Sequence, residues 1–556
     1  MSRKGCGFDA HPGHCRGGEI GRRTCLRSKR GNPWRFESSP RHIKVFLIQY
    51  CLVQLFSKGT KYKILFVASE AAPFVKAGGL GEVMYSLPKA MRVLGHDARV
   101  MAPKYATIDA EKYPLNLEYD GLNLAPDTDD PHGLLKSNVL RYESKENGIT
   151  NYFLENMEYY EKRANVYGYG DDTTRWILLS RGALEFIKIS AWKPDIIIAA
   201  DWQTGFIPNL MKTVYKNDPD ISKITAIFSI HNLKYQGNFD PSLVKEMDSD
   251  DGQGLLPDYF DPRIKYMNGM RRGIKHADII VTVSPTYAKE IMTEQFGEGL
   301  DKLLCERKER LFGILNGLDT ESFDPETDDM LASVFSHDRL TNRIDNKIAL
   351  QKQFGLPVDK DKFVVGMVTR ITGQKGFDIL EQSLGLLMEN LDFQFFIVGE
   401  GEAKYRKIID DLKIKYPDRV GTHFNFDSAL PRLIFGGADT VLIPSKYEPS
   451  GLVQMEAMRY GCIPIVREVG GLVDTVEDFD PKNNKGTGFM FEKYDPMSLT
   501  IAFVRAFEIF RQKKEWERLM KRAMAKDFSW ERSAKEYIKL FKLSAPSKKR
   551  ENDYLP

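Results

Sequence analysis

Short apolar runs rich in β-branched residues alternate with helical sequence from Lys61 onward, and this alternation begins again after Arg310. In the first half the runs are Ile64–Ala68, Asp195–Ala199, Ile224–Ile230 and Ile279–Val283. In the second half they are Phe363–Val368, Phe393–Val398, Val420–Phe424, Thr440–Ile443 and Ile463–Val466. A continuous apolar run is typical of a strand that is buried on both faces of a parallel sheet. The sequence therefore predicts an α/β fold of two doubly wound, Rossmann-like domains that face a cleft.

The boundary between the predicted domains lies near Arg307–Leu318, where a charged helix end meets an Asn-Gly turn. A chain of 556 residues is too long for one core and has room for two domains of this kind. We assign residues 61–310 to the first domain and residues 311–512 to the second. The amphipathic segment 513–545 is expected to form helices that return to the first domain.

The segment 1–60 differs from the rest of the chain. Residues 1–44 contain eleven Lys or Arg against three Asp or Glu, so subtracting this +8 from the total of +3 leaves −5 for the remainder. The segment lacks helix or strand periodicity, and we expect it to be disordered and dispensable. A plastid or mitochondrial transit peptide and an upstream extension of the reading frame are alternatives. A zinc site is a weaker one, because its candidate ligands do not form two tight pairs: Cys6, His11, His14, Cys15 and Cys25.

Composition excludes several classes of partner. With a net charge of +3 and 28% charged residues, nothing indicates a nucleic acid or an acidic partner. The longest apolar run, Ile43 to Phe56, has 14 residues and contains Lys44, whereas a membrane span needs about 20. Six scattered cysteines do not resemble a secreted disulfide framework. We therefore expect a protein without a membrane span in a reducing compartment: the cytoplasm, or a plastid if residues 1–60 are a transit peptide.

A glycine loop with a lysine follows the first predicted strand. Lys76-Ala-Gly78-Gly79-Leu leads into a helix, whose N-terminal N–H groups and partial positive charge favour an anion. Gly78 and Gly79 let the backbone approach a phosphate closely, and Lys76 adds a mobile charge. A plain glycine turn is the alternative. The loop is neither a dinucleotide fingerprint nor a Walker loop.

Two cations follow the first strand of the second domain. Arg370 and Lys375 lie five residues apart in Thr-Arg-Ile-Thr-Gly-Gln-Lys-Gly, at the edge where open sheets bind ligands. Arginine offers a bidentate fork and lysine a compact charge, so both could reach one diphosphate. Positive charge at a helix N-terminus is unfavourable unless an anion compensates it, which disfavours a merely solvated basic turn.

The second glycine turn carries a pair of glutamates. Glu448 precedes Pro-Ser-Gly451-Leu452, and Glu456 lies on the second turn of the following helix. The two carboxylates could accept hydrogen bonds from sugar hydroxyls, although exposed helix glutamates are the alternative. Further polar candidates follow strands of the first domain: Asp201, His231, Asn232 and Asn316. Two Asp-x-Asp pairs, Asp127/Asp129 and Asp248/Asp250, are interpreted as surface loops, so neither a metal nor another cofactor is expected.

Five motifs in this order resemble those of the bacterial glycogen and plant starch synthases, glycosyltransferase family 5, whose fold is two facing Rossmann-like domains (GT-B). The resemblance covers about residues 62–545 and rests on Lys76-Ala-Gly-Gly-Leu, His231-Asn-Leu-Lys-Tyr-Gln-Gly, Asn316-Gly-Leu-Asp, Arg370 to Lys375-Gly, and Glu448-Pro-Ser-Gly-Leu with Gly470-Gly-Leu-Val-Asp-Thr.

The resemblance implies transfer of glucose from ADP-glucose or UDP-glucose to the 4-hydroxyl of a growing α-1,4-glucan, with retention of anomeric configuration. It implies that Lys76, Arg370 and Lys375 contact the diphosphate, which makes leaving-group stabilisation the main catalytic effect. It further implies that Glu448 holds the glucosyl hydroxyls and that His231 lies beside the reacting sugar. The motifs of the family also match Asp201 and Asn316 near the sugar and acceptor. No metal is required.

Some positions depart from the family pattern. Ala200-Asp201-Trp202-Gln203 replaces the usual His-Asp-Trp-His, and Glu82 replaces an Asp, which affects the expected acceptor contacts. Glu456 completes a pair more common in related retaining transferases, where the second Glu binds ribose. Phe426 replaces a Tyr that often stacks on adenine, so the donor nucleotide stays open, with ADP-glucose expected.

Two other functions are alternatives. One is a different retaining GT-B enzyme, of the sucrose-synthase or lipopolysaccharide type, which Lys76-x-Gly-Gly-Leu and His231-Asn-Leu disfavour. The other is a catalytically silent glucan-binding subunit. Binding alone does not need two cations on a leaving group, so Arg370 and Lys375 favour an enzyme.

Overall fold

The computed structural model describes residues 60–125, 128, 130–238, 250–425 and 427–544. The predictions for residues 1–59 and for Phe426 lie outside these residues. Among the described helices, none is both long and apolar enough to cross a bilayer.

The first domain contains a nine-stranded sheet in the order β3-β4-β5-β2-β1-β6-β7-β8-β9. Its strands are β1 (Lys63–Val67), β2 (Asp97–Pro103), β3 (Asn116–Asn123), β4 (Lys136–Glu143), β5 (Thr150–Glu155), β6 (Ile196–Ala200), β7 (Thr225–Ile230), β8 (Ile279–Thr282) and β9 (Leu311–Gly313). The seven strands from β5 to β9 pair in parallel, whereas β4 pairs antiparallel with both β3 and β5. The antiparallel edge was not predicted from the sequence.

Both faces of the parallel part of this sheet are covered, which explains the continuous apolar runs. In β1, Ile64 and Phe66 pack in a core with α2 (Gly79–Val93), while Leu65 and Val67 pack in a second core with α3 (Asp172–Ile189). These four residues are therefore buried on one side of the sheet or the other, whereas Lys63 at the start of the strand is exposed. The other helices of this domain are α4 (Asp201–Thr204), α5 (Phe206–Lys212), α6 (Gly269–His276), α7 (Pro285–Glu290) and α8 (Asp301–Glu306).

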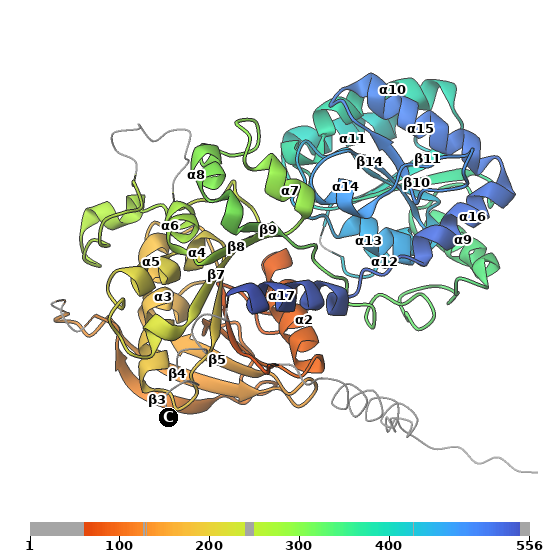
Figure 1. Ribbon diagram of the computed structural model, residues 1–556. Helices are drawn as coiled ribbons and strands as arrows, with labels where there is room; N and C mark the ends of the chain where they lie inside the picture. Colours follow the sequence, from red (N-terminus) through yellow and green to blue (C-terminus); the bar gives the residue numbers. More distant parts are fainter. Residues whose placement is uncertain (1–59, 126–127, 129, 239–249, 426, 545–556) are drawn as a thin grey trace, which may run out of the picture. The chain divides into compact units, whose positions relative to one another are not determined.

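The second domain contains a six-stranded, wholly parallel sheet in the order β12-β11-β10-β13-β14-β15. Its strands are β10 (Phe363–Val368), β11 (Phe393–Val398), β12 (Val420–His423), β13 (Thr440–Ile443), β14 (Ile463–Arg467) and β15 (Phe489–Phe491). Its helices are α9 (Arg343–Gln353), α10 (Phe377–Asn390), α11 (Ala403–Lys415), α12 (Leu430–Gly437), α13 (Val453–Arg459), α14 (Gly471–Thr475), α15 (Pro496–Phe510) and α16 (Lys513–Met524). They cover both faces of the sheet (Figure 1). The predicted fold class, two doubly wound α/β domains, is confirmed.

The limits of the domains differ from the predicted ones in two places. β9 pairs with β8 and so belongs to the first sheet, whereas residue 311 was predicted to open the second domain. A strand of three residues is too short to show periodicity in the sequence. Of the terminal helices, α16 packs in the core of the second domain through Trp516 and Leu519. Only α17 (Trp530–Ser544) packs on the first domain, beside α2 (Figure 1).

Candidate active site

The loops that carry the predicted site residues of the second domain lie where the strand order of the sheet changes direction. β10 lies between β11 and β13, and the chain passes from β10 outward to β12 before it returns at β13. Such a switch point, at the carboxyl ends of the strands, is where open α/β sheets bind ligands. The loop after β10 carries Lys375, and the loop after β13 carries Glu448.

Glycine brings these two loops together. Gly376 has φ of +80°, and a side chain on it would lie 2.0 Å from the Pro444 carbonyl oxygen. Lys446 N–H donates to the Gln374 carbonyl oxygen at 2.8 Å. The turn that carries Lys375 is therefore fixed against the loop that carries Glu448.

Lys375 and Glu448 form an ion pair. Lys375 Nζ lies 2.6 Å from Glu448 Oε2, and the Ser445 hydroxyl donates to the same oxygen at 2.9 Å. The two side chains are only 17% and 9% exposed. They line a small cavity of about 50 Å³ together with Gly451 and Leu452, which precede α13. A cation, a carboxylate and a helix N-terminus thus face one space.

Arg370 lies on another side of the same loop. Its side chain is exposed and lines a larger cavity of about 670 Å³. Asn232 of the first domain lines this cavity too, as does Tyr447. The structure thus brings Arg370 and Asn232 to one cavity, and Lys375 and Glu448 to another.

The first domain has its own switch point, between β1 and β6. The glycine loop follows β1, with Gly78 as the residue before α2. The buried carboxylate of Glu70 accepts hydrogen bonds from Ala77 N–H and, at 2.9 Å, from Gly78 N–H. Glu70 therefore occupies part of the N-terminus that the sequence predicted to hold a phosphate, and the prediction overlooked it. A carboxylate close after a buried strand was the available signal.

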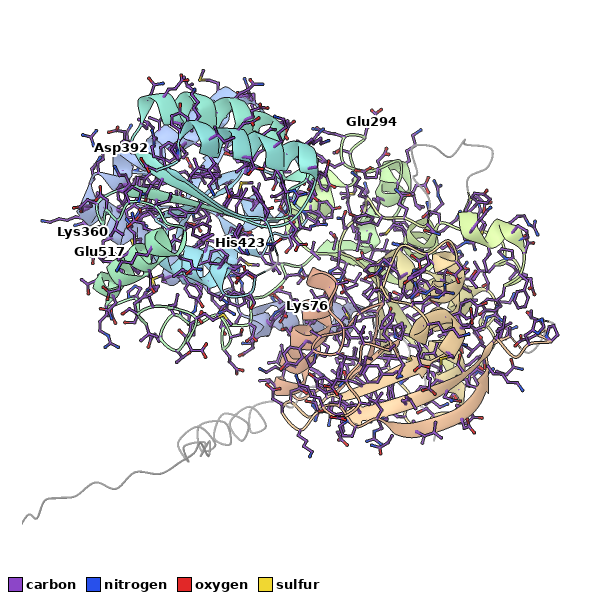
Figure 2. The ribbon with its side chains drawn as sticks, turned by 180° about the vertical axis from the view of Figure 1, so that it is seen from behind. Lys76, Glu294, Lys360, Asp392, His423 and Glu517 are labelled. Carbon is purple, nitrogen blue, oxygen red and sulfur yellow. The ribbon has the colours of Figure 1, made fainter. Side chains whose placement is uncertain are left out.

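Lys76, labelled in Figure 2, projects from this loop. Its Nζ lies 3.0 Å from Glu82 Oε2 in an ion pair whose side chains are 55% and 27% exposed. Ser86 Oγ donates to the other Glu82 oxygen at 2.8 Å. Glu82 therefore positions the lysine from the first turn of α2.

Asp201 and His231 meet at the carboxyl ends of β6 and β7. Asp201 Oδ1 accepts hydrogen bonds from the backbone N–H groups of His231 at 2.7 Å and Asn232 at 3.3 Å. Burial raises the pKa of Asp201 to about 7 and lowers the pKa of His231 to about 4. The imidazole is therefore neutral at pH 7, and its Nε2 lies 3.0 Å from the Ser229 hydroxyl.

Glu456 lines a third cavity, of about 840 Å³, which it shares with Lys76, Glu82 and Arg432. Burial raises the pKa of Glu456 to about 7, while Arg432 and Lys76 act in the opposite direction. Glu456 and Glu448 thus line different cavities, although the sequence placed them together.

Asn316 lies where the chain leaves the first domain. Its neighbour Leu318 donates a backbone hydrogen bond to Phe528 at 2.7 Å. Gly317 packs so closely on the backbone of Trp530 that a side chain on it would lie 2.5 Å from Cα. The two stretches that join the domains are therefore in direct contact.

The interpretation of Asp250 as a surface residue is wrong. Its carboxylate is 3% exposed and accepts two hydrogen bonds from Arg272, at 2.7 and 2.8 Å. The acidic, turn-like sequence gave no sign of a buried arginine partner. Asp127, Asp129 and Asp248 lie outside the described residues.

Two doubly wound domains with polar loops at both switch points have the architecture of the GT-B glycosyltransferases. The sequence model of the starch synthase catalytic domain matches residues 63–306, and that of glycosyl transferases group 1 matches residues 350–521. The chain belongs to the glycogen and starch synthase family.

Individual relatives agree with this assignment. A glycogen synthase of Synechocystis is 41% identical over 488 residues, which cover 86% of this chain and 94% of that protein. A glycogen synthase of Desulforudis audaxviator is 37% identical over 86% of this chain and 96% of its own length. Among solved structures, the catalytic domain of starch synthase IV from Arabidopsis thaliana, bound to ADP and acarbose, is similar with a TM-score of 0.75 and 31% identity. The similarity covers 87% of this chain and 100% of that one.

Proposed function

We propose that this protein transfers glucose from ADP-glucose to the 4-hydroxyl of an α-1,4-glucan, with retention of the anomeric configuration. Membership in the glycogen and starch synthases supports the glucan acceptor. The similarity to a starch synthase that was solved with ADP supports ADP-glucose over UDP-glucose.

The observation that carries the proposal is the Lys375–Glu448 pair at the switch point of the second sheet. The ammonium group, 2.6 Å from the carboxylate, can move a short distance onto a diphosphate, while Glu448 can accept hydrogen bonds from glucosyl hydroxyls. Negative charge grows on the diphosphate as the glycosidic bond breaks, so cations fixed there stabilise the transition state more than the ground state.

The other cations come from both domains. Arg370 adds a bidentate donor to the diphosphate from the loop after β10. We assign Lys76 and Gly79 to the diphosphate from the first domain, because Lys76 lines the same cavity as Glu456 of the second domain. Closure of the two domains around the donor would exclude water that could hydrolyse it.

Groups of both domains complete the proposed sugar and nucleotide contacts. The neutral His231 and Asn232 lie beside the reacting sugar, and Asp201 orients both through their backbone N–H groups. Asn316 contributes near the acceptor. Glu456 accepts hydrogen bonds from the ribose. Stacking of Phe426 on the base stays a prediction from the sequence, because this residue lies outside the described residues. Gly451 and Leu452 present the N-terminus of α13 to the phosphate.

The test is incubation of the full-length protein with radiolabelled ADP-glucose or UDP-glucose and a glycogen primer. We expect incorporation into the glucan, faster from ADP-glucose. Equal or faster incorporation from UDP-glucose would overturn the donor assignment. Binding of glycogen without transfer from either donor would instead favour a silent glucan-binding subunit.

We further propose that the protein acts in the cytoplasm, or in a plastid if residues 1–60 are a transit peptide. The scattered cysteines support a reducing compartment.

A further inference from the structure

Two carboxylates join α7 of the first domain to α14 of the second. Asp474 accepts hydrogen bonds from the backbone N–H and the hydroxyl of Thr286, both at 2.8 Å. In the opposite direction, Glu290 Oε1 accepts a hydrogen bond from Gly470 N–H at 2.9 Å. The two helices lie side by side in Figure 1. Each domain thus caps a helix start of the other.

The residue that Glu290 holds lies directly on the backbone of Glu448. Gly471 N–H donates to the Glu448 carbonyl oxygen at 3.0 Å. A side chain on Gly470 would lie 2.0 Å from that same oxygen, and one on Gly471 would lie 2.0 Å from the Ser450 carbonyl oxygen. Both positions therefore require glycine, because the start of α14 lies in direct contact with the turn that carries Glu448.

These contacts form a short chain from one domain to the other. Glu290 binds Gly470, Gly471 binds the Glu448 backbone, and the Glu448 carboxylate binds Lys375. A shift of α7 relative to α14 would therefore move the turn that carries Glu448, the proposed sugar-binding carboxylate, because two hydrogen bonds connect them.

Glu290 differs from a helix cap at the protein surface because one of its carboxylate oxygens is buried. Its Oε2 is buried without a hydrogen-bond partner among the described residues. Burial raises the pKa of its carboxyl group and the Asp474 carboxylate adds to this, while the hydrogen bond from Gly470 N–H and the Arg467 guanidinium act in the opposite direction. A buried oxygen without a partner destabilises the fold, and such groups in native proteins are often retained for a role in function.

We infer that Glu290 is a positioning residue, which couples the arrangement of the two domains to the placement of Glu448. This inference rests on the proposed function, because it assigns Glu448 to the glucosyl group. Glu290 itself touches no substrate in this account; it acts through Gly470 and Gly471.

The experiment compares Glu290→Ala, which removes the acceptor, with Glu290→Gln, which keeps an oxygen for Gly470 N–H. Lys289→Ala, an exposed neighbour on the same helix, is the control. We expect Glu290→Ala to lower kcat about tenfold, with the ADP dissociation constant changed less than about threefold, and Glu290→Gln to keep at least about half of kcat. The thermal unfolding temperature of each variant reports any general loss of stability.

A double-mutant cycle tests whether the effect passes through Glu448. In a Glu448→Gln background, the further loss caused by Glu290→Ala should shrink to less than about threefold, because the positioned group is already gone. If Glu290→Ala is too unstable to assay, Asp474→Asn, which weakens the reciprocal cap, should lower kcat about threefold with ADP binding unchanged.

An unchanged kcat in Glu290→Ala, an equal loss in Glu290→Gln, or a full tenfold loss in the Glu448→Gln background would each overturn the inference. The wild-type rate tests the proposed function separately. If the wild type transfers no glucose, the proposed function fails; if it does and the ratios between variants do not behave as expected, only the role of Glu290 fails.

Discussion

The two domains hold the lysines that we assign to the diphosphate in different ways. In the second domain, Lys375 is paired with Glu448 at 2.6 Å, with side chains 17% and 9% exposed. In the first domain, Lys76 is paired with Glu82 at 3.0 Å, with side chains 55% and 27% exposed. One pair is buried between two fixed loops, and the other is more exposed and lines a cavity.

This difference indicates a division of tasks. A buried ion pair that loses one partner leaves an uncompensated charge, whereas an exposed pair contributes little by itself. We therefore expect the second domain to hold a preorganised half of the proposed site. We expect the first domain to supply a mobile cation whose effect depends on closure.

The largest expected effect is at the buried pair. Lys375→Ala should lower kcat about a thousandfold, equivalent to roughly 4 kcal/mol of transition-state stabilisation, and should change the donor KM much less. Steady-state kinetics with saturating glycogen measure both constants. Lys407→Ala, a 75% exposed lysine on α11, is the control and should be unchanged.

Arg370→Ala should behave as Lys375→Ala does, because we assign both cations to the same diphosphate. If either substitution only raised KM, that cation would bind the ground state alone, and leaving-group stabilisation would have to be assigned elsewhere.

A smaller effect is expected at the exposed pair. Lys76→Ala should lower kcat about thirtyfold and leave the unfolding temperature unchanged, since an exposed ion pair adds little stability. Lys188→Ala, an exposed lysine on α3, serves as the control. A loss as large as that of Lys375→Ala would show that the two lysines are equally preorganised and would break the comparison.

A smaller effect, on the pH dependence of ADP affinity, is expected at Glu456, which lines one cavity together with Lys76 of the first domain. Its raised pKa of about 7 means that the folded protein keeps this group protonated at lower pH and ionises it as the pH rises through 7. An ionised carboxylate accepts stronger hydrogen bonds from ribose hydroxyls. Between about pH 6 and pH 8, ADP affinity in the wild type should therefore rise about threefold more than in Glu456→Gln.

Calorimetric titration of both proteins across this range measures the difference. The comparison with Glu456→Gln is needed because the terminal phosphate of ADP itself titrates with a pKa of about 6. Parallel pH profiles in the two proteins would remove Glu456 from the nucleotide site.

The smallest expected change is in the dimensions of the protein. If Lys76 reaches the diphosphate only after closure, X-ray scattering should show a smaller radius of gyration with saturating ADP and an unreactive glucan than without ligands. Lys76→Ala should close less completely under the same conditions. Identical radii with and without ligands, alongside normal turnover, would leave Lys76 without its proposed role across the cleft.

Much of the fold could be predicted because buried parallel strands leave a local signal. Phe363–Val368, Phe393–Val398 and Thr440–Ile443 were predicted with the bounds that the structure has. By contrast, β3 is exposed along nearly all of its length and is held by pairing with β4, so its sequence contains no apolar run. Pairing across the antiparallel edge is a long-range property that short windows of sequence cannot show.

The sequence also could not show on which domain each of the last helices packs. Both α16 and α17 are amphipathic, and either apolar face could in principle cover either domain. Contacts decide between them: Trp516 packs on the second core, while Tyr537 and Phe541 pack with the first.

The sequence by itself determined the two doubly wound domains, the family and the residue types of the candidate site, because strand periodicity, glycine turns and cations after strands are local features. Only the tertiary structure decided which of these groups meet. It paired Lys375 with Glu448, placed Glu70 at Gly78, separated Glu456 from Glu448, and joined Glu290 to the turn of Glu448 across the domains. Distances and burial between residues far apart in the chain follow from packing, and packing sets the charges and pKa values on which the proposed chemistry depends.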